Sequence, residues 1–174
     1  MHHTDLEEDA LYLEDEDTQK DKYLTFHLAG EDYAIAVKHV VEIVGLQRIT
    51  EVPDTMTFVK GVINLRGKII PVIDVRIRFR LETRTYDERT CIIIVDMGET
   101  TVGLIVDKVS EVMDIPESQV SPPPKTTKGS QNRYIQGFGR IEDRVKLILD
   151  IEMLLSDTEK ESLQEIAPEA NVAA

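Results

Sequence analysis

From Tyr23 onward, short apolar runs rich in Val and Ile alternate with Gly, Pro, Asp and Asn. Such runs, bounded by turn residues, are typical of β-strands. The pattern predicts strands at residues 23–28, 33–37, 41–49, 61–65, 69–74, 91–97, 101–106, 109–115, 137–141 and 144–150. Hairpin-type turns are predicted at residues 29–32, 65–68 and 98–100. Most links are short, so neighbouring strands are expected to be antiparallel.

Three segments depart from the strand pattern. Residues 53–59 are interpreted as a helical turn, and residues 121–132, with three consecutive prolines, as the longest structureless loop. Residues 152–166 predict a helix that packs on the sheet through the apolar stripe Met153, Leu154, Leu163 and Ile166.

The strand region contains an internal duplication of three blocks in the same order. Residues 23–31 match 91–99 at an offset of 68, residues 34–43 match 103–112 at 69, and residues 61–75 match 137–151 at 76. The rise in offset places the extra residues of the second half in the proline loop. Each half is then a small curled sheet that must bury one face against its twin, which predicts two small barrels with a groove at their junction.

The net charge of −13 is concentrated at the two ends of the chain. Residues 1–21 carry −8, residues 151–174 carry −5, and residues 22–150 are balanced. A balanced middle argues against binding to nucleic acid or to an anionic membrane, which require a basic face. No stretch approaches the roughly 20 apolar residues of a membrane helix, and the acidic N-terminus differs from a signal peptide, so a cytoplasmic protein is expected.

One local exception to the balance is the arginine strip Arg76, Arg78, Arg80, Arg84 and Arg89. Its first members alternate with Ile77 and Phe79, which favours the solvent-facing side of a strand, or of the turn after it. An SH3-like nucleic-acid-binding module that uses this strip stays open as the alternative function.

The sequence contains no constellation of catalytic or metal-ligating residues. The histidines, His2, His3, His27 and His39, lack ligand spacing, and Cys91 lies in an apolar run typical of a buried small residue. Asp74 and Asp150 end equivalent repeat blocks and are interpreted as capping residues. We therefore expect no enzyme activity, no catalytic residue, no metal and no cofactor.

Glu42 and Arg66 break the symmetry of the repeat, because their counterparts are Glu111 and Glu142. Only the first half can pair opposite charges at these positions. If the two residues lie on neighbouring strands facing the groove, the carboxylate would orient the guanidinium toward a partner. The alternative is an ordinary surface ion pair, worth about 0–1 kcal/mol.

The segment from Val59 to Arg76, with its Gly-x-x-Asn-Leu-Arg-Gly core, resembles the chemotaxis coupling protein CheW family, which is built on the CheW-like domain. Residues 33–43 and 102–112 resemble the same family in the same order, and the similarity runs from about Tyr23 to Leu155. The resemblance implies a mainly β fold of two intertwined five-stranded SH3-like barrels with a hydrophobic junction, short helices and a C-terminal helix. It also implies a non-enzymatic adaptor without a cofactor.

On this resemblance the chain divides into three parts. Residues 1–21 are an acidic disordered arm, and residues 156–174 are the end of the C-terminal helix and a flexible tail. Residues 22–155 form the CheW-like domain, with a first half of about 22–89, a second half of about 90–155, and an exchange of strands between them.

Members of this family couple the cytoplasmic tips of transmembrane chemoreceptors to the regulatory domain of the histidine kinase CheA. The resemblance therefore implies a cytoplasmic protein in membrane-associated receptor arrays, without insertion into the membrane. Carried over by motif, the receptor-binding residues are Val40, Glu42, Gly61, Leu65, Arg66, Val112 and Gly137. Kinase binding is expected at the turn with Val37 and Lys38, and the polar residues 125–128 argue against an apolar contact to a second kinase domain.

Overall fold

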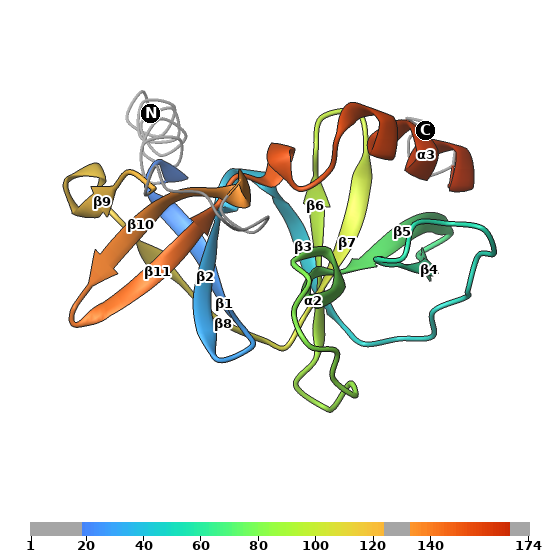
Figure 1. Cartoon of the computed structure of the whole chain (residues 1–174), viewed down its shortest axis with the longest axis horizontal. Helices are drawn as coiled ribbons and strands as arrows, with labels where there is room; N and C mark the ends of the chain where they lie inside the picture. The colour runs from blue at the N-terminus through green and yellow to red at the C-terminus, as the bar shows by residue number, and fades with distance from the viewer. Residues whose placement is uncertain (1–18, 124–132, 168–174) are drawn as a thin grey trace, which may run out of the picture.

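The computed structural model describes residues 19–123 and 133–167, which fold into two β-sheets (Figure 1). The six-stranded sheet has the order β8-β1-β2-β11-β10-β9. Its strands are β1 (Lys22–Leu28), β2 (Glu31–Ala36), β8 (Lys108–Asp114), β9 (Val120–Ser121), β10 (Ile135–Ile141) and β11 (Arg144–Leu149). The five-stranded sheet has the order β3-β6-β7-β5-β4. Its strands are β3 (Val40–Gly45), β4 (Val59–Leu65), β5 (Lys68–Asp74), β6 (Cys91–Asp96) and β7 (Thr101–Val106).

The two sheets have the same topology and exchange strands. The pair β1 and β2 lies in one sheet with β8, β10 and β11 of the second half, while β6 and β7 lie in the other sheet with β3, β4 and β5 of the first half. In both sheets the exchanged strands meet through one parallel pairing, β11 with β2 and β5 with β7. Two intertwined barrels of related topology are therefore present, as the fold prediction required.

Each sheet closes into a barrel through a short pairing at the same place. Thr50, after β3, bridges to Val62 on β4, and β9, after β8, pairs with β10. A glycine stands at both closures: a Cβ on Gly61 would lie 2.1 Å from the Thr50 carbonyl oxygen, and one on Gly137 would lie 3.0 Å from that of Ser121. The two glycines of the repeat therefore permit close approach of the backbones that seal the barrels.

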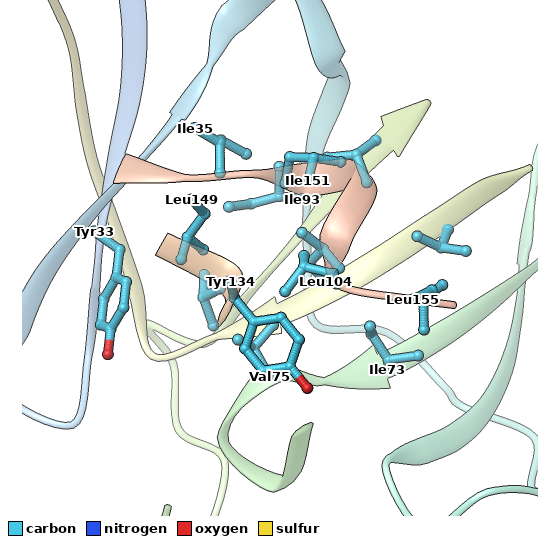
Figure 2. Close-up of a cluster of buried hydrophobic side chains, with 14 of the residues drawn as sticks. Tyr33, Ile35, Ile73, Val75, Ile93, Leu104, Tyr134, Leu149, Ile151 and Leu155 are labelled. Carbon is cyan, nitrogen blue, oxygen red and sulfur yellow. The ribbon is translucent and has the colours of Figure 1, made fainter. Parts of the chain in front are cut away.

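The largest hydrophobic cluster lies between the barrels and takes side chains from both sheets (Figure 2). Ile35 and Leu149 from the six-stranded sheet meet Ile73, Ile93 and Leu104 from the five-stranded sheet. Each barrel also has its own interior cluster, one around Ile70 and Ile94 and a smaller one around Ile148. The residues of the largest cluster are buried only because the two sheets pack together.

The ladders correct one block of the predicted repeat. The buried residues Leu24, Phe26 and Leu28 correspond in the shared core to Ile93, Val95 and Met97, an offset of 69. The registers agree, because Phe26 pairs with Tyr33 as Val95 pairs with Val102. The offset of 68 was therefore wrong by one residue. The two turns have the same length, because the Met97 N–H donates to the Thr100 carbonyl where Leu28 pairs with Glu31, but the glycine stands second in the first turn (Gly30) and first in the second turn (Gly98).

Two further elements differ from the prediction. Residues 53–58 form turns and no helical turn, and the C-terminal segment divides into a 3₁₀ turn (Ile151–Met153) and helix α3 (Asp157–Ile166). The helix begins at Ser156, whose hydroxyl and Glu159 form a capping box. Of the predicted proline loop, Ser121 ends strand β9. The rest of this loop from residue 124 on, with residues 125–128, most of the acidic arm (1–18) and the end of the C-terminal tail (168–174) lie outside the described residues.

The interpretation of the arginine strip as solvent-facing was wrong for Arg76 and Arg78, whereas Arg80, Arg84 and Arg89 are exposed. Residues Val75–Arg78 form the short helix α2, which turns Arg76 and Arg78 back onto the fold, with 12% and 11% of their side chains exposed. Arg76 pairs with Asp107, and Arg78 pairs with Glu159 and donates to the Leu154 carbonyl. Both guanidinium groups are thereby committed to internal partners.

Candidate functional site

The Glu42–Arg66 pair is built by a strand and a tight turn. Along β3 the side chains at 40, 42 and 44 are half-buried while those at 41 and 43 are exposed, so Glu42 lies on the inner side. Arg66 lies in the turn between β4 and β5 with φ of +53°, followed by Gly67 at +88°. The Asn64 side chain accepts a hydrogen bond from the Gly67 N–H at 2.8 Å and fixes this turn.

The pair joins the two edges of the five-stranded sheet. The Arg66 Nη2 group donates to both carboxylate oxygens of Glu42 at 2.5 Å. Strands β3 and β4 are the first and last in the sheet order, so they come together only because the barrel closes. The Arg66 side chain is still 71% exposed. Among the described residues, its Nε and Nη1 groups have no hydrogen-bond acceptor, so they face solvent. The carboxylate therefore holds one end of the guanidinium and leaves the rest available.

A shallow pocket of about 200 Å³ lies beside the ion pair. It is lined by Val41, Glu42, Leu65, Arg66, Lys68, Ile70, Ile94 and Thr101. Val41 is 59% exposed, so the pocket combines an exposed aliphatic wall with a cationic rim. Such a surface suits a partner that offers an apolar side chain beside a hydrogen-bond acceptor.

The structure brings only some of the predicted receptor-binding residues together. Glu42, Leu65 and Arg66 line the pocket, whereas Val40 lies at the start of β3 and packs against the shared core. Val112 is 54% exposed on β8, at the edge of the other sheet. Gly61 and Gly137 are buried at the barrel closures, where they shape the backbone.

The sequence interpretation missed two exposed aliphatic residues on β3. Val41 and Ile43 are 59% and 42% exposed, although they stand in an apolar run. The alternation around Glu42 was the available signal: a carboxylate on one side of a strand, with Val or Ile at both neighbouring positions, puts those neighbours on the opposite face.

The predicted kinase-binding turn is the 3₁₀ turn Val37–His39 between β2 and β3. Lys38 is exposed, and Val37 is half-buried. Lys38 also lines a second, larger pocket of about 460 Å³ at the entrance to β1, together with Lys22 and Tyr23. The turn and the Glu42–Arg66 pair thus line different pockets.

The carboxylates at the strand ends act as caps, as predicted. Asp74 accepts hydrogen bonds from the backbone N–H groups of Arg76 and Ile77, and Asp150 accepts one from Glu152. Asp74 also accepts from the Tyr86 hydroxyl at 2.7 Å, and burial together with this bond raises the pKa of Tyr86. Within residues 19–123 and 133–167, no group of three or more His, Cys, Asp or Glu side chains could hold a metal ion.

Sequence comparison places this arrangement among known proteins. The CheW-like domain matches residues 22–159, which is most of the chain. The chain belongs to the CheW-like domain family. Among its CheW relatives, the chemotaxis protein CheW of Klebsiella aerogenes is 36% identical over 151 residues, covering 87% of this chain and 91% of the relative. The CheW of Bacillus subtilis is 34% identical over 149 residues, covering 86% and 94%.

A CheW crystal structure also has the same fold. The scaffolding protein TtCheW of Thermoanaerobacter tengcongensis superposes with a TM-score of 0.74 at 38% identity, covering 81% of this chain and 96% of TtCheW. The chain is accordingly a non-enzymatic chemotaxis adaptor of the CheW type. The nucleic-acid alternative gains no support, since Arg76 and Arg78 are bound internally. In the part of the chain that the structure describes, no helix is long and apolar enough to cross a membrane.

Proposed function

We propose that this adaptor couples the cytoplasmic tips of chemoreceptors to the regulatory domain of the histidine kinase CheA, in arrays at the cytoplasmic side of the membrane. Membership of the CheW family supports the proposal. The observation that carries the receptor side is the oriented, exposed guanidinium of Arg66 next to the exposed aliphatic side chain of Val41.

The receptor-binding surface is centred on the pocket beside Glu42 and Arg66. Interfaces commonly combine an apolar centre with an arginine that makes directed hydrogen bonds at its margin. Here Val41 and Leu65 supply the apolar part, and Arg66 supplies donors that Glu42 has already oriented. Because an oriented side chain loses less entropy on binding, the ion pair contributes affinity even where its own stability is small.

The remaining residues of the predicted surface act in two ways. Val112 extends the apolar surface through its exposed side chain on β8. Gly61 and Gly137 act through the closure of the barrels, because a larger residue would displace Thr50 or Ser121 and the strand edges with them. Val40 supports the inner side of β3.

Kinase binding is assigned to the separate turn with Val37 and Lys38. Two partners on two surfaces of one rigid body need no chemistry in the adaptor. A change in receptor packing shifts the kinase between its active and inactive states when the contacts made through the adaptor differ in free energy between those two states.

The test compares Arg66→Ala and Glu42→Ala with Arg140→Ala, an exposed arginine on β10 that lines no pocket described here. We expect either of the first two variants to keep the native fold and to weaken receptor binding by about tenfold, or about 1.4 kcal/mol. Arg140→Ala is expected to bind normally. Binding is measured by co-sedimentation with a receptor cytoplasmic fragment, with the kinase present or absent.

A double variant in which the two charges are exchanged tests whether receptor binding needs the oriented guanidinium group or only a salt bridge at these positions. The double variant Glu42→Arg with Arg66→Glu keeps a salt bridge but presents a carboxylate to the partner, so receptor binding should remain weak while stability recovers. Normal receptor binding by both alanine variants would contradict the surface assignment.

Lys38→Glu should weaken binding to the kinase and leave receptor binding unchanged, and the reverse result would refute the two-surface arrangement.

A further inference from the structure

A basic pocket of about 290 Å³ lies where β1 ends and β8 begins, below the loop that follows α2. It is lined by His27, Gly30, Arg84, Arg89, Asp107 and Lys108. Lys108 stands opposite His27 in the β1–β8 ladder, so the sheet fixes the backbone position of this lysine. In Figure 1 the β1–β2 turn and the loop after α2 lie at the lower side of the molecule.

Two acids, Asp107 in the lining and Asp87 beside Arg84, are already paired with arginines. Burial would raise the pKa of Asp107, but hydrogen bonds from Arg76 and the Ala29 N–H, with the charge of Arg76, outweigh it and lower the pKa. Asp87 is held by Arg84 at 2.7 Å. Arg89 and Lys108 are exposed and form no ion pair within the described part of the chain. The side chains that line the pocket therefore include two unpaired cations, Arg89 and Lys108.

The most acidic segment of the chain enters the fold at the other end of β1. Residues 1–18, outside the described residues, contain eight Asp or Glu and no Lys or Arg. The seven residues of β1 separate its start at Lys22 from the pocket by about 20 Å, at about 3.3 Å per residue. Asp9 and Lys22 are 13 positions apart in the sequence, and a flexible chain of that length has a root-mean-square span of about 20 Å. Effective concentration is highest when the linker span matches the distance, so the carboxylates around Asp9 are well placed to reach the pocket.

The pocket at the start of β1 is the competing position, and its charge is less suitable. It contains Lys20, Lys22 and Lys38, but also Asp21 and Glu117. Burial raises the pKa of Tyr23 there, and the charges of Asp21 and Glu117 add to this effect, so both acids act on this side chain. An acidic segment would be attracted less strongly to this position.

We propose that the pocket of Arg84, Arg89 and Lys108 is an anion-binding surface whose occupant is the acidic arm, residues 1–18, of the same chain. The arm covers the basic pocket at low ionic strength, and an acidic segment of another protein must displace it to bind there. This interaction is independent of the receptor and kinase surfaces proposed above.

Paramagnetic relaxation in the full chain tests the proposal. Cys91 is changed to Ser, Thr4 is changed to Cys and carries a nitroxide label, and amide signals are compared with the reduced label. We expect the strongest signal loss at Gly30, Arg89 and Lys108. The loss should disappear between about 0.01 M and about 1 M NaCl, as the Debye length falls from about 30 Å to about 3 Å.

Matched variants and a mixing experiment decide between the outcomes. Arg89→Glu with Lys108→Glu should abolish the signal loss, whereas Arg140→Glu should leave it unchanged; retention of native chemical shifts elsewhere shows that both fold. Signal loss centred on Lys38 and Gln136, or spread evenly over the surface, would overturn the proposal. So would loss in an isotope-labelled copy mixed with a spin-labelled, unlabelled copy, since the arm would then bind a second molecule.

Discussion

Gly61 is the residue with the least room for a side chain among the glycines of the two sheets. A Cβ at this position would lie 2.1 Å from the Thr50 carbonyl oxygen, and its φ of +145° is strained for any L-residue. We expect Gly61→Ala to reduce the free energy of unfolding by at least about 2 kcal/mol, because both overpacking and backbone strain are introduced. Urea denaturation followed by circular dichroism measures the change.

Gly45 provides the control for this prediction. It lies at the end of β3 in the same barrel, and a Cβ there would have no neighbour within 4 Å. Gly45→Ala should change stability by less than about 0.5 kcal/mol. Equal stabilities for the two variants would show that the barrel closure at Thr50 does not constrain position 61.

Local chemistry made some residues predictable, and long-range pairing hid others. The capping roles of Asp74 and Asp150 follow from their own neighbours, since the accepted N–H groups are two or three residues away. The burial of Arg76 and Arg78 depends on Asp107 and Glu159, which are 31 and 81 residues distant. Arginines alternate with apolar residues both in a strand with one solvent-facing side and in a short helix whose arginines form ion pairs with distant acids. The sequence pattern alone therefore does not show which of the two is present.

At the scale of elements, α3 offers a clean test of capping. Ser156 accepts a hydrogen bond from the Glu159 N–H at 3.2 Å, and the Glu159 side chain accepts one from the Ser156 N–H at 2.8 Å. Ser156→Ala should lower stability by about 1 kcal/mol and speed amide exchange in the first turn of the helix. Ser162→Ala, in the helix interior, should be neutral or slightly stabilising, because alanine has the higher helix propensity. Equal exchange in both variants would exclude a role for the cap.

Element positions were predicted well, but one repeat register was not. The strands were found because apolar runs and turn residues alternate along the whole domain. The first repeat block was aligned on Gly30 and Gly98, yet the glycine is the second residue of the β1–β2 turn and the first residue of the β6–β7 turn, so this alignment shifts the strand before the turn by one residue. A shift of one residue exchanges the two faces of a strand, and only the ladder or the burial pattern reveals it.

At the scale of the molecule, the duplication predicted two barrels but does not by itself specify how the halves share strands. A barrel made of one half and a barrel made of exchanged strands require the same apolar pattern. The observed exchange puts β1 and β2 with strands more than 70 residues away, and it places the shared core between the sheets. The Glu42–Arg66 pair depends on this arrangement only through closure of the five-stranded barrel, since both residues belong to the first half.

The exchange of strands also predicts that the two barrels unfold together. Ile70 and Ile148 are 3% and 1% exposed in the separate interiors of the two barrels. We expect Ile70→Ala and Ile148→Ala each to lower stability by about 2–5 kcal/mol. Both should shift one common thermal transition, because the core between the barrels contains residues of both sheets and neither survives alone. Calorimetry should then give equal calorimetric and van't Hoff enthalpies for each variant.

Val145→Ala, at a 50% exposed position on β11, is the control and should leave the transition unchanged. Two resolved transitions, with Ile148→Ala displacing only one of them, would mean that the barrels are independent units despite their exchanged strands.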